Sequence, residues 1–205
     1  MTRQNEKPEI VRKLVIFSDI CSSTTILEDL KASDNLSSWV NFLINLKENF
    51  INWGSSKGIE MHKFIGDGWV FLAAHNIAQE ILFDFLDTCW YMFDIAMREE
   101  SIYDKLSRQP NPMGLTFGID SGDLIKLEMN DQAEYVGRPL NVAARLQGAA
   151  KKYSQANGVS GLISRSALAQ LSGKPPDPDI VKLEPVTVFL KNISGGQEIG
   201  CWHWQ

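Results

Sequence analysis

The stretch KFIGDGWVF at residues 63–71 constrains the fold more than any other part of the chain. It has the pattern of two apolar strands joined by a Gly-Asp-Gly turn, which glycine favours because it reaches positive φ without strain. Such a turn presents the side chain of Asp67 outward. The residue could be an ordinary turn aspartate. It could equally hold a hard divalent cation, since such ions prefer carboxylate oxygens.

A second acid, Asp19, follows a nearly continuous apolar segment at residues 11–18, which predicts a central buried strand. Hydroxyl residues come next at 22–25, and these residue types are good helix N-caps. The spacing of Ile26 and Leu30 predicts a helix after them. A strand, an acid and a helix N-terminus together favour a site for a metal-bound phosphate, although a simple capped helix would give the same local pattern.

Hydrophobic periodicity organises the rest of the chain as alternating helices and strands. Helices are predicted at residues 39–53, within 77–106 and at 140–152. Strands are predicted at residues 58–65, 69–73, 159–163, 181–183 and 186–190, and a second hairpin at 113–127 with its turn at Ser121 and Gly122. We expect an N-terminal tail at 1–10 and a single domain at 11–205, with an α+β fold in which helices pack on a mostly antiparallel sheet.

Charge and composition exclude several classes of partner. The net charge of −5 argues against general affinity for nucleic acid or for an anionic membrane. No apolar run approaches the roughly 20 residues that span a bilayer, and the N-terminus has no signal-peptide core. The three cysteines, at positions 21, 89 and 201, are far apart and odd in number, which suggests reduced thiols and a cytoplasmic location.

Four sequence blocks together resemble the signatures of the class III nucleotidyl cyclases. They are FSDICSST at 17–24, KFIGDG at 63–68, GRPLNVAARL at 137–146 and LKNI at 190–193, in the order of that family. The resemblance implies a ferredoxin-like, palm-type fold and a head-to-tail homodimer with active sites at the interface. It also implies an enzyme that converts a nucleoside triphosphate to its 3′,5′-cyclic monophosphate and pyrophosphate.

The resemblance assigns a role to each matching residue. Asp19 and Asp67, with the carbonyl of Ile20, would hold two Mg²⁺ or Mn²⁺ ions per site. The phosphate-binding residues would be Cys21, Ser22, Ser23 and Lys191. Asn141 would orient the ribose and Arg145 would stabilise charge on the α-phosphoryl group, both reaching the site from the partner protomer. Without the resemblance, the latter two residues would be an ordinary solvated helix face.

Four residues would recognise the base: Lys63, Glu134, Tyr135 and Arg138. Lys63 and Glu134 stand where adenylate-forming members carry Lys and Asp, whereas guanylate-forming members carry Glu and Cys, so guanine is disfavoured. The pair could read adenine, but Glu is one methylene longer than Asp and leaves less room for a purine, and Lys63 could equally donate to a pyrimidine carbonyl. Tyr135 and Arg138 would add bulk and a donor fork, or simply pack the loop.

The opening FSDICSST and the free-standing domain resemble the pyrimidine cyclases of bacterial antiphage (Pycsar) systems. That resemblance implies cyclic UMP, or less readily cyclic CMP, as a messenger for antiviral defence that a separate effector protein reads. Three alternatives remain: an adenylate cyclase, an inactive cyclase-like regulatory module and a polymerase-like palm domain. The intact Asp, Asn and Arg positions favour an enzyme, and the acidic balance disfavours a nucleic-acid partner.

Overall fold

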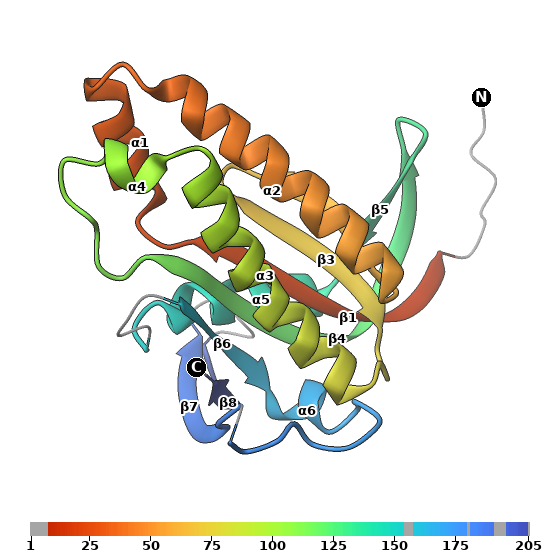
Figure 1. Ribbon diagram of the computed structural model, residues 1–205. Coiled ribbons are helices and arrows are strands. Elements are labelled where there is room, and N and C mark those ends of the chain that lie inside the picture. Colours follow the sequence, from red (N-terminus) through yellow and green to blue (C-terminus); the bar gives the residue numbers. More distant parts are fainter. Residues whose placement is uncertain (1–7, 154–157, 180, 191–195, 205) are drawn as a thin grey trace.

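The computed structural model describes residues 8–153, 158–179, 181–190 and 196–204, which form an eight-stranded mixed sheet with helices on both faces (Figure 1). The strands are β1 (Glu9–Ile20), β2 (Ile59–Ile65), β3 (Gly68–Ala74), β4 (Gly114–Met129), β5 (Gln132–Val136), β6 (Gly158–Ser164), β7 (Glu184–Leu190) and β8 (Gln197–Trp204). The helices are α1 (Ser23–Ala32), α2 (Leu36–Ser56), α3 (Gln79–Glu99), α4 (Ile102–Lys105), α5 (Arg138–Ala150) and α6 (Arg165–Leu168).

The sheet has the order β2-β3-β1-β4-β6-β8-β7, and β5 pairs with the extended end of β4. β1 lies between β3 and β4 and is antiparallel to both, while β4 and β6 are parallel. A mostly antiparallel sheet with packed helices confirms the predicted α+β class. The central place of β1 explains its continuous apolar sequence, because both of its faces are covered.

The two faces of the sheet carry different layers. Side chains alternate along β1, so Leu14 and Ile16 join the large core beneath α1, α2 and α3, whereas Val15 points to the opposite face. That second face is covered by α5, as Figure 1 shows. Asp19 has the same parity as Val15 and therefore belongs to the face of α5.

A glycine lets α5 approach the sheet closely. A Cβ atom at Gly118 of β4 would lie 2.1 Å from the carbonyl oxygen of Ala143 and 2.1 Å from the amide nitrogen of Gln147. Any side chain there would push α5 away from β4. This contact fixes the height of the helix above the sheet, and it brings the C-terminal end of α5 to the end of β1.

Two predictions about strands were wrong, and one strand was missed. No turn forms at Ser121 and Gly122, because β1 pairs with β4 without interruption from Glu9–Lys126 to Ile20–Leu115 and holds it extended. The chain turns instead at residues 130 and 131, whose φ values of 53° and 60° are those of a type I′ hairpin. Residues 181–183 have no strand, and the C-terminal strand β8 was not predicted.

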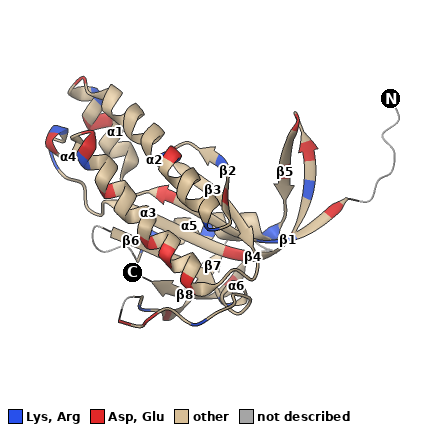
Figure 2. Ribbon diagram, turned by 45° about the vertical axis from the view of Figure 1, so that its right-hand side comes forward, with Lys and Arg blue, Asp and Glu red and all other residues tan. Residues whose placement is uncertain are grey.

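The charged residues are spread over many elements. Figure 2 shows Lys and Arg on several helices, strands and loops, with acidic residues marking the length of α3. Within the part of the chain that the structure describes, no helix is long and apolar enough to span a membrane.

Candidate active site

Two aspartates lie side by side at one end of the sheet. Asp19 is near the end of β1 and pairs with Gly68, the first residue of β3. Asp67 precedes Gly68 in the turn that joins β2 to β3, where Gly66 has a φ of 67°. A Cβ atom at Gly68 would lie 2.5 Å from the carbonyl oxygen of Ser18. Glycine at this position therefore allows the turn to fold tightly against the Asp19 strand.

Burial and neighbouring charge act together on Asp19. Burial raises the pKa of its carboxyl group above the ordinary value, and repulsion from Asp67 raises it further. A hydrogen bond and the positive charge of Lys151, together with a weaker hydrogen bond from Gln147, act in the opposite direction. Like charges in a partly buried site favour a bound cation, which would stabilise both carboxylates in their ionised form.

Lys151 supplies a cation within the chain. Its Nζ lies 2.5 Å from Oδ2 of Asp19, and it directly follows the last residue of α5. Partial burial opposes the charge of Lys151, but the hydrogen bond and charge of Asp19 raise its pKa overall. Sequence reasoning missed this residue, because it belongs to no motif and reaches Asp19 only through the packing of α5 on β4.

The donor set at this edge suits a hard divalent cation. Two carboxylates supply the oxygen ligands that Mg²⁺ and Mn²⁺ prefer, and Ile20, proposed to add its carbonyl, is the last residue of β1. In the described ranges, no group of three or more His, Cys, Asp or Glu is arranged to hold a metal ion. The protein ligands of a cation here would therefore be the two aspartates and a backbone carbonyl.

The turn after β1 is shaped by a left-handed residue. Ser22 has a φ of 58° and is the N-cap of α1, so the first amides of that helix begin at Ser23. The predicted phosphate-binding amide of Cys21 instead donates to the carbonyl oxygen of Gly114 at 2.8 Å. The hydroxyl of Ser22 donates to the carbonyl oxygen of Pro112. The amide of Cys21 is therefore engaged within the chain, whereas the first turn of α1 begins at Ser23 and offers amides to a phosphate. Lys191 lies outside the described residues.

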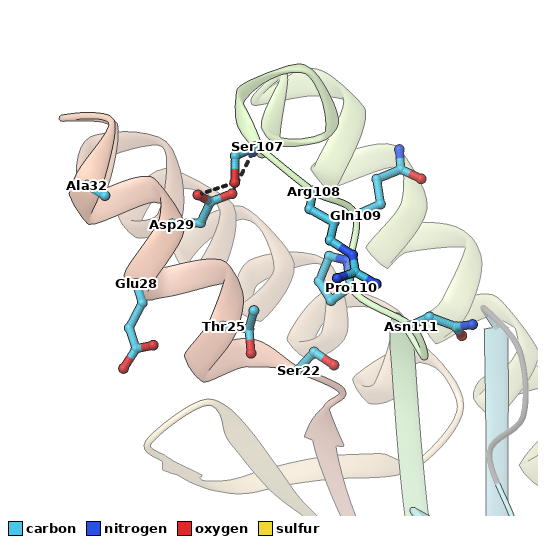
Figure 3. A pocket seen from close by; sticks show the side chains of 10 residues that line it. All are labelled: Ser22, Thr25, Glu28, Asp29, Ala32, Ser107, Arg108, Gln109, Pro110 and Asn111. Atoms are coloured by element: carbon cyan, nitrogen blue, oxygen red, sulfur yellow. Dashed lines mark hydrogen bonds between the residues drawn. The ribbon is translucent and has the colours of Figure 1, made fainter.

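A separate hollow of about 590 Å³ opens on the other side of Ser22, between α1 and the loop at 107–111. Figure 3 shows Arg108 beside Pro110 in this hollow, facing the first turn of α1. Asp29 closes one end by accepting hydrogen bonds from the amide and the hydroxyl of Ser107. The hollow includes neither Asp19 nor Asp67 in its lining, so it is distinct from the paired aspartates.

Helix α5 carries two groups of side chains that bear on the site. Ala144 and Gln147 line a small cavity of about 180 Å³ that Asp19 and Gly68 also line. Asn141 and Arg145 are exposed on the same helix. Among the described residues, no hydrogen bond or ion pair joins Asn141 or Arg145 to either aspartate of its own chain. Both are thus available to a second molecule.

The predicted base-recognition residues are only partly brought together. Nζ of Lys63 lies 2.5 Å from Oε2 of Glu134, and the ring of Tyr135 meets the ring of His62 edge-on at 5.1 Å. Arg138 points elsewhere: it donates to Oε1 of Gln197 and approaches Asp120 at 3.9 Å. Its guanidinium is therefore not part of the Lys63–Glu134 contact, contrary to the expectation that it adds a donor fork there.

His62 is a further member of this cluster that sequence reasoning missed. Nε2 of His62 lies 3.7 Å from the same oxygen of Glu134, and burial lowers the pKa of the imidazole. The register of β2 against β3 shifts between Met61 and Lys63, which is a β-bulge. Bulges turn consecutive side chains toward the same side, and no sequence signal marks this one.

No protein-family model matches the chain, and no curated protein is similar to it in sequence. Solved structures share its fold. The adenylyl cyclase CyaB from P. aeruginosa matches with a TM-score of 0.69 and 17% identity over 98% of this chain and 96% of that one. The guanylyl cyclase Cya2 matches with a TM-score of 0.62 and 17% identity over 96% and 93%. A bacterial light-regulated adenylyl cyclase matches with a TM-score of 0.67 and 15% identity over 98% of this chain.

That last match covers 53% of the light-regulated protein, so the chain spans about half its length. At these identities the likeness concerns the fold. It confirms the predicted fold class, which this chain shares with an adenylyl and a guanylyl cyclase structure.

Proposed function

We propose that this protein is a nucleotide cyclase that converts a nucleoside triphosphate to its 3′,5′-cyclic monophosphate and pyrophosphate. The observation that carries the proposal is the pairing of Asp19 with Gly68, which sets Asp67 beside Asp19 on this fold. Structural neighbours support a triphosphate as the substrate: one guanylyl cyclase domain is described in complex with GTP, and a cyclase core of converted specificity with ATPαS.

The two aspartates and the Ile20 carbonyl would hold two divalent cations, Mg²⁺ or Mn²⁺. Such ions, when bound, lower the pKa of a ribose 3′-hydroxyl and offset the charge of the phosphates. The amides that begin at Ser23 would bind terminal phosphate oxygens at the positive end of the α1 dipole. Lys191 is proposed to bind phosphate as well.

In the proposed reaction, the 3′-oxygen loses its proton to solvent and forms a bond to the α-phosphorus. The bond from that phosphorus to the bridging oxygen breaks, and pyrophosphate leaves with the electron pair. Arg145 would donate to the α-phosphoryl oxygens, where negative charge changes most along the reaction. Asn141 would hold the ribose so that its 3′-oxygen faces the phosphorus.

The arrangement supports a head-to-tail homodimer. Asn141 and Arg145 are exposed and, within the described residues, form no hydrogen bond or ion pair with the aspartates of their own chain, so a partner copy would deliver them. The β4–β5 hairpin projects from the sheet (Figure 1) and exposes apolar side chains on its strands. They are Ile125, Leu127, Met129 and Val136. An apolar surface of this kind suits contact with a second copy.

For the base we propose a pyrimidine, with UTP ahead of CTP. Glu134 is one methylene longer than Asp, and His62 contacts its carboxylate while the ring of Tyr135 packs against His62. These neighbours support a preference for the smaller, single-ring base. The second candidate is ATP, because the Lys63–Glu134 pair offers a donor for a ring nitrogen and an acceptor for an amino group. With a pyrimidine product, the protein would be a cytoplasmic source of a messenger for antiphage defence, read by a separate effector.

Incubation with ATP, GTP, CTP and UTP in turn, with Mn²⁺ and mass analysis of the products, tests the proposal. Cyclic UMP is the expected product, and the Asp67→Asn variant should form at least about a hundredfold less of it. Asp123→Asn is the matched control, since Asp123 is exposed and pairs with Arg12. Cyclic AMP as the exclusive product would show that ATP, and not a pyrimidine nucleotide, is the substrate. The absence of a cyclic product from any of the four nucleotides would refute the proposed cyclase activity.

A further inference from the structure

The ammonium of Lys151 contacts Asp19, one of the two carboxylates proposed above as metal ligands. It lies 2.5 Å from Oδ2, and its half-exposed side chain reaches there from the C-terminal end of α5. The close packing of α5 on Gly118 fixes the position from which the side chain extends. The fold therefore sets the backbone position of Lys151 within reach of Asp19.

The charges of Asp19, Asp67 and Lys151 do not balance. Asp19 and Asp67 bring two negative charges together, and Lys151 is the cation that the structure pairs with them in the described ranges. A single positive charge leaves the pair half neutralised, whereas a divalent cation neutralises both carboxylates. The ammonium and a metal ion cannot occupy the same position against Oδ2 of Asp19, so binding of one displaces the other.

We propose that Lys151 belongs to the metal and phosphate site. Its ammonium takes the place of a divalent cation in the metal-free protein and releases Asp19 when the ion binds. It then contacts the phosphates of the substrate. This inference rests on the proposed function, because it takes Asp19 as a metal ligand and a triphosphate as the substrate.

The second half of the inference follows from reach and charge. A lysine has a flexible four-carbon stem and three donors, so its ammonium can move a few ångströms without movement of α5. The two aspartates neutralise part of the positive charge of two divalent ions. A triphosphate carries more negative charge than the remaining positive charge can offset. The displaced ammonium therefore stays near the phosphates rather than turning to solvent.

Titration with Mn²⁺ alone, followed through the signal of free Mn²⁺ in electron paramagnetic resonance, measures the competition without any turnover. Lys151→Met should bind Mn²⁺ roughly three- to tenfold more tightly than the unaltered protein, because a partly exposed ion pair no longer opposes the metal. Lys151→Gln should behave in the same way. Lys152→Met is the matched control, since Lys152 is the exposed neighbour and should leave Mn²⁺ affinity unchanged.

Binding of inorganic tripolyphosphate in saturating Mn²⁺, measured by calorimetry, tests the contact with phosphate independently of the base. Lys151→Met should weaken it several-fold, and Lys152→Met should not. Unchanged or weaker Mn²⁺ binding in both Lys151 variants would overturn the displacement. Unchanged tripolyphosphate affinity in Lys151→Met would overturn the proposed contact of the displaced ammonium with the phosphates.

The binding experiments test the role of Lys151 separately from the cyclase activity. A protein that forms no cyclic product, yet shows both shifts in the Lys151 variants, would refute the cyclase and retain the role of Lys151. An active cyclase whose Mn²⁺ and tripolyphosphate affinities ignore Lys151 would do the reverse.

Discussion

Nζ of Lys63 lies 2.5 Å from Oε2 of Glu134, so residues of β2 and β5 form one ion pair within a single chain. The side chain of Glu134 is 22% exposed and that of Lys63 is 43% exposed, which leaves the pair accessible to a ligand. His62 approaches the same oxygen of that carboxylate at 3.7 Å. If the base binds at this cluster, as we propose, it exchanges hydrogen bonds with Lys63 and Glu134, and the length of Glu134 limits its size.

The length of Glu134 should set base preference. Glu134→Asp withdraws the carboxylate by one methylene, so the ratio of kcat/KM for ATP to that for UTP should rise about tenfold. Competition between the two nucleotides, read by mass analysis of the products, gives this ratio directly. Glu128→Asp, on the exposed part of β4, is the control and should leave the ratio unchanged. The same ratio in Glu134→Asp would remove Glu134 from base recognition.

Two inactive variants should complement each other if the active site is shared between protomers. A dimer of one Asp67→Asn chain and one Arg145→Ala chain has one site with both defects and one site with neither. After the purified variants are mixed and allowed to exchange subunits, about a quarter of the original activity should return. Steady-state assays before and after exchange measure this recovery. Activity that stays at the level of the separate variants would show that each chain completes its own site.

The sequence predicted the parts of the site that depend on local pattern. Asp19 follows an apolar run and Asp67 sits in a Gly-Asp-Gly turn, and antiparallel pairing of β1 with β3 then brings them together. Lys151 and His62 escaped prediction because their places depend on tertiary packing and on a bulge. The predicted turn at residues 121 and 122 failed for a related reason, since a long pairing with β1 overrides local turn propensity.

The buried carboxylate of Asp120 should make the protein less stable at neutral pH than a neutral side chain at this position would. Its side chain is 1% exposed, and burial raises the pKa of the carboxyl group despite a hydrogen bond from Ser164. The folded state therefore holds the proton more tightly than the unfolded state. The stability that this proton contributes is lost as the pH rises from the ordinary pKa of Asp through the higher pKa of Asp120 in the folded state. It stays lost above that pKa.

Asp120→Asn keeps the acceptor for Ser164 and removes the charge. It should raise the free energy of unfolding by roughly 1 kcal/mol at neutral pH, and the gain should shrink as the pH falls toward about 4. Urea denaturation across this range measures both effects. The exposed Asp123→Asn variant should show no such gain. Equal stability of Asp120→Asn and the unaltered protein at neutral pH would contradict the prediction.

Two glycines associated with α5 should respond in opposite ways to the same substitution. At Gly118 a Cβ atom would meet backbone atoms of α5 at 2.1 Å, so Gly118→Ala must displace the helix and should cost about 1–3 kcal/mol of stability. At Gly148, within α5, a Cβ atom meets nothing within 4 Å, so Gly148→Ala should stabilise by about 0.5–1 kcal/mol through helix propensity. Urea midpoints give both values.

Activity should separate the two variants further. Displacement of α5 in Gly118→Ala shifts Lys151 relative to Asp19 and moves Asn141 and Arg145, so turnover should fall by about tenfold or more even at a temperature where the variant stays folded. Gly148→Ala leaves the helix in place and should keep turnover within about twofold. A stable and fully active Gly118→Ala protein would mean that the approach of α5 to β4 does not position the site.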